Sequence, residues 1–137
     1  MKEVFADTSY WLAVANPADQ WAAAAAAATA ALGPVRILTT EEVLAEFLNS
    51  YGRSSVTVRR QAARIVRVIL ADPGVTVVAQ SHESFLAGLS LYEHRLDQGY
   101  SFTDCASMIC MRSRKIAEAL TSDRHFVAEG FSALLSK

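Results

Sequence analysis

The chain has 137 residues, of which 52% are hydrophobic and 20% are charged, and its formal net charge is −1. These values predict one globular domain over residues 1–137, able to bury roughly two thirds of its unfolded surface. No apolar run reaches the length of about 18 residues that spans a membrane, and the first residues lack the pattern of a secretory signal. Cys105 and Cys110 lie five residues apart in one predicted helix and point to different faces, so we expect no disulfide and a reducing, cytoplasmic location.

The first predicted element is a short apolar strand that ends at Asp7 and leads into a helix over residues 8–15. If this strand is central, Asp7 points into the crevice beyond the carboxyl ends of the strands, where open α/β sheets bind ligands. An alanine-rich helix follows from about Trp21 to Leu32, and Asp19 or Asn16 is expected to cap it. Alanine is the best helix former, so this helix needs little support from tertiary packing.

The middle of the chain continues the alternation of strands and helices. A strand is predicted over residues 35–38, and Thr39 or Thr40 is expected to cap the helix that follows. Glu42 and Glu46 both lie on the flank of that helix's apolar stripe. The next predicted helix spans residues 55–71 and directs six apolar residues inward: Val58, Ala62, Ile65, Val66, Ile69 and Leu70.

The last part of the chain predicts two more helices and the remaining strands. Ser81 opens a helix that runs to about Leu96, and Ser101 with Asp104 has the spacing of a capping box for a helix ending near Ser113. The other expected elements are a strand at 75–78, a strand at 116–120 ending before Asp123, a turn or short helix at 124–126 and a strand at 131–135. Strands rich in valine, isoleucine and leucine that alternate with helices predict an α/β fold: a mostly parallel sheet of four to five strands with helices on both faces.

Four carboxylates occur at or near the ends of these elements, at Asp7, Glu46, Asp104 and Asp123. In a right-handed α/β fold such acids can converge on one crevice, where their mutual repulsion favours a bound divalent cation. Oxygen ligands alone favour Mg²⁺ or Mn²⁺, and a site of this kind can hydrolyse a phosphodiester. Each acid also has a simpler interpretation: Asp7 as a helix cap, Asp104 as part of a capping box, Asp123 as a turn residue and Glu46 as a solvated acid. Glu42 is a rival to Glu46.

Other side chains add little chemistry by themselves. The arginines of the 55–71 helix can hold a phosphate backbone, although such a stripe is more often a solvated face. The three histidines are scattered without zinc-site spacing, and Ser9 and Ser122 have no nearby histidine–acid pair for nucleophilic catalysis. Cys105 follows Asp104 directly, and we interpret it as a small core residue.

Four segments together resemble a known family. They are "FADTSYW", "TTEEVLAEFLNSYG", "LDQGYSFTDCASM" and "LTSDRHFVAEGF", in order between about Val4 and Leu135. This pattern resembles the PIN domain of VapC-type toxins of toxin–antitoxin pairs. The resemblance implies a three-layer α/β/α sandwich and a metal-dependent ribonuclease. It further implies Asp7, Glu46, Asp104 and Asp123 as catalytic and metal-binding residues for Mg²⁺ or Mn²⁺, and it selects Glu46 over Glu42.

The same resemblance implies supporting residues and partners. Ser9 and Thr103 match positions near the metal. From the residues themselves rather than the resemblance, Arg60, Arg64, Arg67 and Arg124 are the candidate phosphate contacts. Members of the family commonly form homodimers and are held inactive by a small antitoxin, but this chain departs from them in its alanine-rich helix, a region where the family meets partners. We therefore expect an endoribonuclease acting on single-stranded or looped RNA. The alternatives are a non-catalytic RNA-binding module of the same fold, and a phosphatase with Asp7 as nucleophile, which would normally carry an acid where Ser9 stands.

Overall fold

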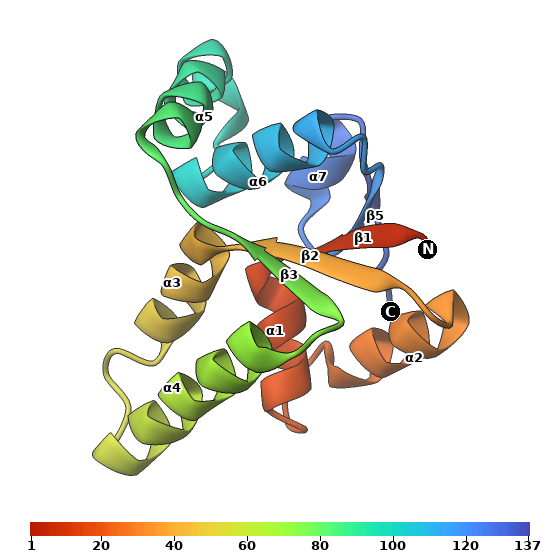
Figure 1. Ribbon diagram of the computed structural model, residues 1–137, viewed down its shortest axis with the longest axis vertical. Helices are drawn as coiled ribbons and strands as arrows, with labels where there is room; N and C mark the ends of the chain where they lie inside the picture. Colours follow the sequence, from red (N-terminus) through yellow and green to blue (C-terminus); the bar gives the residue numbers. More distant parts are fainter.

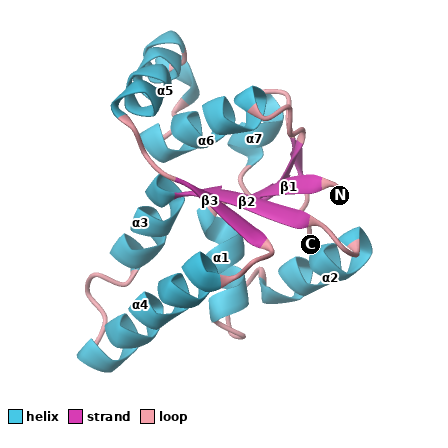
Figure 2. Ribbon diagram, viewed as in Figure 1, coloured by secondary structure: helices cyan, strands magenta, loops and turns pink.

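The computed structural model describes residues 1–137, and its central feature is a five-stranded sheet in which every pairing is parallel (Figures 1 and 2). The strands are β1 (Glu3–Ala6), β2 (Arg36–Thr40), β3 (Val75–Val78), β4 (Glu118–Leu120) and β5 (Ser132–Ala133). Their order, β3-β2-β1-β4-β5, places β1 in the middle. The chain builds outward from β1 to β3 and then returns to β4 and β5 on the other side. The strand order therefore reverses beside β1, the kind of place where such sheets form ligand sites.

Helices cover both faces of this sheet. They are α1 (Thr8–Ala15), α2 (Ala22–Leu32), α3 (Glu41–Ser50), α4 (Val56–Ala71), α5 (His82–His94), α6 (Phe102–Ser113) and α7 (Arg124–Ala128). Right-handed crossovers that run in opposite directions place their helices on opposite faces. Accordingly α1 to α4 lie on one side, and α6 and α7 lie on the other with α5 packed outside α6 (Figure 1). The predicted α/β/α sandwich is confirmed.

The central strand is part of the hydrophobic core. Val4, Phe5 and Ala6 are fully buried, because helices cover both faces of β1. Four of the largest buried side chains around them come from β2, α3, α6 and α7: Leu38, Phe47, Met108 and Phe126. Asp7 directly follows this strand, so its backbone is anchored at the edge of the core.

Side-chain caps begin most of the longer helices, as the sequence predicts. Thr40 caps α3 by accepting a hydrogen bond from the Val43 N–H (3.1 Å), and Ser55 caps α4. The prediction for α2 is wrong. Its N-cap residue is Trp21, which makes no side-chain cap, and the Asp19 carboxylate accepts instead from the Trp21 N–H (2.8 Å) in the turn before the helix. Asp19 therefore stabilises a local turn, a role that aspartate also favours.

Some helices and strands end at other residues than predicted, mainly where few other elements pack against them. The strand expected at 131–135 is reduced to two residues, because β5 lies at the sheet edge and pairs only with β4. The helix expected to reach Leu96 ends at His94, and a 3₁₀ turn leads to Gly99, whose φ of +73° favours glycine. Val58 and Leu70 of α4, predicted to point inward, are 37% and 51% exposed, because α4 packs beside the edge strand β3.

Two further observations bear on expectations from the sequence. No helix in the structure combines the length and the apolar character needed to cross a membrane. Cys105 is buried and Cys110 is half-buried, and both thiols are free.

Candidate active site

The four predicted carboxylates line one pocket of about 490 Å³ at the carboxyl ends of β1 and β4. We call it the acidic pocket. Segments far apart in the sequence meet here: the start of α1, the middle of α3, the start of α6 and the start of α7. Its lining residues are Asp7, Thr8, Ser9, Leu12, Glu46, Gly99, Ser101, Asp104, Ser122, Asp123 and His125.

Asp7 is the most deeply buried of the four acids, with 4% of its surface exposed. Its Oδ2 accepts a hydrogen bond from the Thr121 hydroxyl (2.8 Å), whereas its Oδ1 is buried without a partner. Burial raises the pKa of Asp7 to about 7 against the opposing effect of the Thr121 bond, and the charges of Asp104 and Glu46 raise it further. Although Asp7 is the N-cap residue of α1, its side chain makes no capping bond. Helix capping therefore does not account for this carboxylate.

Asp104 both caps its helix and faces the pocket. Its Oδ2 accepts from the Ser101 N–H (3.1 Å), and the Ser101 hydroxyl accepts from the Asp104 N–H (3.0 Å), which completes the predicted capping box. Burial raises the pKa of Asp104, the Ser101 N–H lowers it, and the charge of Asp123 raises it. The capping bonds thus fix the orientation of a carboxylate that would otherwise rotate freely.

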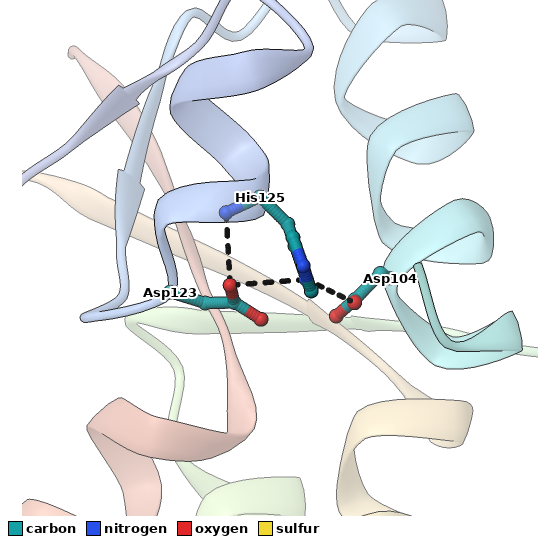
Figure 3. A group of neighbouring side chains, drawn as sticks. All are labelled: Asp104, Asp123 and His125. Atoms are coloured by element: carbon teal, nitrogen blue, oxygen red, sulfur yellow. Dashed lines mark hydrogen bonds and ion pairs between the residues drawn. The ribbon is translucent and has the colours of Figure 1, made fainter. Parts of the chain in front are cut away.

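Asp123 and His125 lie together at the start of α7. Asp123 Oδ1 caps α7 by accepting from the His125 backbone N–H (2.9 Å), and the Asp123 N–H donates to Thr121 Oγ1 (3.0 Å). The His125 ring lies between two acids, with Nδ1 3.2 Å from Asp123 Oδ1 and 3.5 Å from Asp104 Oδ2 (Figure 3). Sequence reasoning missed His125 by treating the histidines as scattered. The available signal was its place two residues after Asp123, in the short segment that follows β4.

The structure separates Glu46 from its rival Glu42. Glu46 lines the acidic pocket, and its Oε1 accepts a hydrogen bond from the Thr8 hydroxyl across the pocket wall. Glu42 lies one turn earlier on α3 and lines two neighbouring hollows instead. The position of Glu46 in the acidic pocket is consistent with the choice of Glu46 that the family resemblance implies.

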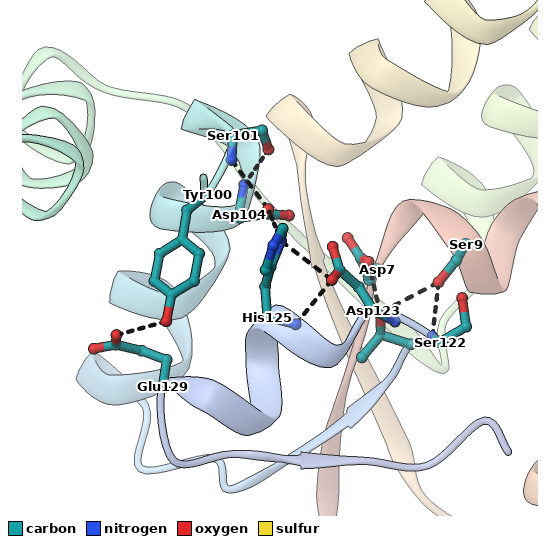
Figure 4. Close-up of polar contacts among 10 residues, drawn as sticks. Asp7, Ser9, Tyr100, Ser101, Asp104, Ser122, Asp123, His125 and Glu129 are labelled. Carbon is teal, nitrogen blue, oxygen red and sulfur yellow. Dashed lines mark hydrogen bonds and ion pairs between the residues drawn. The ribbon is translucent and has the colours of Figure 1, made fainter. Parts of the chain in front are cut away.

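The two expected supporting residues lie in different places. Ser9 lines the acidic pocket, where its hydroxyl accepts from the Ser122 N–H (3.1 Å) and lies 3.3 Å from Thr121 Oγ1 (Figure 4). Thr103 lines an adjoining hollow that it shares with Glu42 and Glu46. Thr8 and Thr121, which the sequence did not single out, hold Glu46 and Asp7 directly. Thr8 follows β1 and Thr121 follows β4, and this position is the only local sign that they hold a carboxylate in place.

None of the four candidate arginines lines the acidic pocket. Arg60, Arg64 and Arg67 are exposed on α4, and Arg64 borders a largely apolar groove between α1 and α4 together with Trp11. Arg124 is exposed at the start of α7, next to Asp123. A role in binding phosphates therefore requires nucleic acid that extends beyond the pocket.

The donor set fits a hard divalent cation. A buried carboxylate oxygen without a partner normally costs free energy, and Asp7 Oδ1 is such an atom. Burial and like charges raise the pKa values of Asp7 and Asp104, and the charge of His125 offsets this only in part for Asp104. Asp104, Asp123 and His125 each bring a ligand atom within 4.8 Å of the others. Carboxylate oxygens arranged in this way are the ligands that Mg²⁺ and Mn²⁺ prefer.

Comparison with known proteins places this chain among characterised relatives. Residues 4–130 match the family described as the PIN domain. The chain is 31% identical over 131 residues to the 23S rRNA-specific endonuclease VapC20 of Mycobacterium tuberculosis, covering 93% of this chain and 95% of that protein. The same similarity holds for VapC20 from two strains, CDC 1551 and H37Rv.

Solved structures agree with the sequence comparison. The crystal structure of Mycobacterium tuberculosis VapC20, described as a sarcin–ricin loop cleaving toxin, superposes with a TM-score of 0.85 at 26% identity, over 97% of this chain and 99% of that one. PAE2754 from Pyrobaculum aerophilum shares the fold, with a TM-score of 0.61 at 17% identity, over 96% and 87% of the two chains. The chain therefore belongs to the PIN-domain family and is of the VapC toxin type.

Proposed function

We propose that this chain is a divalent-metal-dependent endoribonuclease that cleaves phosphodiester bonds in single-stranded or looped RNA, acting from one domain over residues 1–137. The observation that carries the proposal is the convergence of Asp7, Glu46, Asp104 and Asp123 on one pocket, with a buried and unpartnered oxygen on Asp7. The relative that is named for cutting 23S rRNA covers nearly the whole chain, so a structured loop of ribosomal RNA is the substrate class to test first.

The four carboxylates would hold Mg²⁺ or Mn²⁺. Such an ion, when bound, makes water a stronger nucleophile and stabilises the negative charge that develops on a phosphodiester. The residues of the chain keep the carboxylates in place: Thr121 holds Asp7, Thr8 holds Glu46, and the Ser101 N–H holds Asp104. Because these donors are fixed by strand and helix ends, the ligands need little reorganisation when the ion binds.

The wider proposal includes partners and location. Arg60, Arg64, Arg67 and Arg124 are the candidate contacts to RNA phosphates outside the pocket, and Ser9 and Thr103 are candidates for orienting water or an acid. A small antitoxin protein, a homodimer and a cytoplasmic location follow from the resemblance to VapC toxins and remain predictions.

The experiment is cleavage of purified ribosomal RNA by the purified chain with Mn²⁺, with Mg²⁺ and with chelator. We expect cleavage with either ion and none with chelator. Glu46→Gln should lower the cleavage rate at least about a hundredfold, since loss of a ligand exceeds the 10–100-fold effect of losing an outer contact. Glu42→Gln is the matched control on the same helix and should cut at nearly the wild-type rate.

Two outcomes would contradict the proposal. RNA that binds equally well with and without chelator and is never cut would indicate a non-catalytic RNA-binding module. Equal rates for Glu46→Gln and Glu42→Gln would show that the acidic pocket is not the catalytic centre.

A further inference from the structure

The His125 ring occupies a position that its hydrogen bonds do not explain. Nδ1 is buried and lies within 3.5 Å of a carboxylate oxygen on each side, from Asp104 and Asp123, yet it makes no hydrogen bond to either. The backbone N–H of His125, by contrast, donates to Asp123 Oδ1 at 2.9 Å. The ring nitrogen therefore lies at ion-pair distance from both acids (dashed lines in Figure 3), although it forms a hydrogen bond with neither.

The spacing of these three atoms matches that of ligands around one ion. Adjacent ligands of an octahedral ion with bonds of 2.0–2.1 Å lie about 3 Å apart. The Nδ1 distances of 3.2 Å and 3.5 Å are slightly longer than this spacing, and all three ligand atoms fall within 4.8 Å of one another. Only a small contraction would bring the three atoms into one coordination sphere.

A second observation points to a ligand in the same place. Asp7, with only 4% of its surface exposed, lines the same pocket as His125 and Asp123, and its Oδ1 has no hydrogen-bond partner. Two buried atoms of one pocket that could bind a metal, Asp7 Oδ1 and His125 Nδ1, thus lack hydrogen-bond partners. We propose that His125 Nδ1 is a direct ligand of the divalent ion in the acidic pocket, so that the site has mixed nitrogen and oxygen donors.

The surroundings of His125 restrain its ring. The Tyr100 ring packs against it with centroids 5.2 Å apart, and the Tyr100 hydroxyl donates to Oε1 of Glu129 (3.1 Å), the residue that follows α7 (Figure 4). Arg95 and Arg112 hold Glu129 in turn, at 2.9 Å and 2.6 Å. The packed and anchored Tyr100 ring therefore limits how far the His125 imidazole can rotate.

A nitrogen ligand changes which ion the pocket prefers. Imidazole binds transition metals well, whereas Mg²⁺ prefers oxygen ligands and binds imidazole poorly. The inference rests on the proposed metal site and makes it more specific: Mn²⁺ should bind more tightly than Mg²⁺, and His125 should be the reason.

Pulsed electron paramagnetic resonance of the Mn²⁺-loaded protein tests this without measuring activity. We expect modulation from a directly coordinated ¹⁴N nucleus in the wild-type protein and in His94→Ala, a control whose histidine is exposed on α5. The modulation should disappear in His125→Ala. Wild-type protein alone decides the question if the variant fails to fold, because bound Mn²⁺ without nitrogen modulation would overturn the proposal.

Titration with Mn²⁺ and Mg²⁺ separates a ligand from a positively charged neighbour. As a ligand, His125 supports binding, so His125→Ala should weaken Mn²⁺ at least about tenfold and weaken Mg²⁺ much less. Tighter Mn²⁺ binding by His125→Ala would show that the imidazole repels the ion, and would overturn the proposal while leaving the metal site intact. If wild-type protein binds no Mn²⁺ at all, the proposed metal-dependent function fails together with this inference.

Discussion

Two buried carboxylates at opposite ends of α7 have opposite electrostatic surroundings. Glu129, with a side chain only 4% exposed, accepts from Arg95, Arg112 and Tyr100, and the Arg95 hydrogen bond is the main reason that its pKa falls to about 2. Asp7, beside the start of α7, has one hydroxyl donor and two neighbouring acids, and burial raises its pKa to about 7. Arg95 and Arg112 thus balance the charge of Glu129 without any group from outside the chain. No arginine or lysine lines the acidic pocket, and we propose that a bound cation balances its charge.

This contrast separates structural acids from functional ones. A buried ion pair satisfies its own charges and needs nothing from solution. A buried acid without a countercharge destabilises the fold unless something else compensates, and groups with strongly shifted pKa values therefore gather at functional sites. Four predictions test the contrast, in order of expected size.

The largest change in stability is expected from Asp7→Asn in metal-free protein. Raising the pKa of this carboxyl from 3.8 to about 7 costs at most about 4 kcal/mol. The stability linked to Asp7 is fully present below pH 3.8 and is lost as pH rises through about 7. Asp7→Asn should therefore increase the free energy of unfolding at pH 8 with chelator present, and should have little effect near pH 4. Urea unfolding at both pH values measures this, and a less stable variant at pH 8 would contradict it.

Adding Mn²⁺ should compensate the same charge in the wild-type protein. At a free concentration one hundred times the dissociation constant, binding stabilises the native state by about 2.7 kcal/mol. For a chain of this length the thermal midpoint should rise by about 10 °C. Asp7→Asn should show a much smaller rise under the same conditions. Equal shifts in the two proteins would place the Mn²⁺ site elsewhere.

Glu129→Gln should act in the opposite direction. It leaves Arg95 and Arg112 without their anion, which we expect to cost about 2 kcal/mol, less than a fully buried pair because both guanidinium groups are partly solvated. The stability linked to Glu129 is present above pH 4.5 and is lost as pH falls through about 2. The difference from wild type should shrink below pH 4.5 in an acid unfolding series. A constant difference down to pH 2 would attribute the effect to packing.

Replacing the exposed arginines of α4 should not change the surroundings of Asp7 or Glu129. If Arg60, Arg64 and Arg67 contact RNA phosphates, changing all three to alanine should reduce the salt dependence of RNA binding by about two in logarithmic slope. Fluorescence anisotropy in the non-cleaving Asp7→Asn background measures it. In the protein that retains Asp7, the three replacements should leave Mn²⁺ binding unchanged. An unchanged slope would show that α4 does not contact the RNA backbone.

Local sequence patterns predicted those parts of the pocket that depend on one element at a time. An apolar run that ends in an acid located Asp7, and the spacing of a capping box located Asp104. These signals are local because strands and helices end where backbone groups need polar partners. The same local signals predict the fold, because a chain of alternating strands and helices can adopt only a few topologies.

Contacts between distant elements could not be predicted in this way. Thr8 donates to Glu46 across 38 positions, and Glu129 collects partners from the ends of α5 and α6. Choosing Glu46 over Glu42 required the family resemblance, because both face the same flank of α3. His125 was missed because its partner Asp104 lies on a different helix. Side-chain convergence of this kind depends on the packing of α3, α6 and α7, which no spacing in the sequence encodes.

The most direct test of the central claim is an anomalous difference map from a crystal of this protein soaked with Mn²⁺. We predict one strong peak in the acidic pocket, about 2.2 Å from oxygen atoms of Asp7 and Asp104. A map in which Mn²⁺ occupies other sites, while the pocket shows no peak, would contradict the claim that these acids bind a cation together.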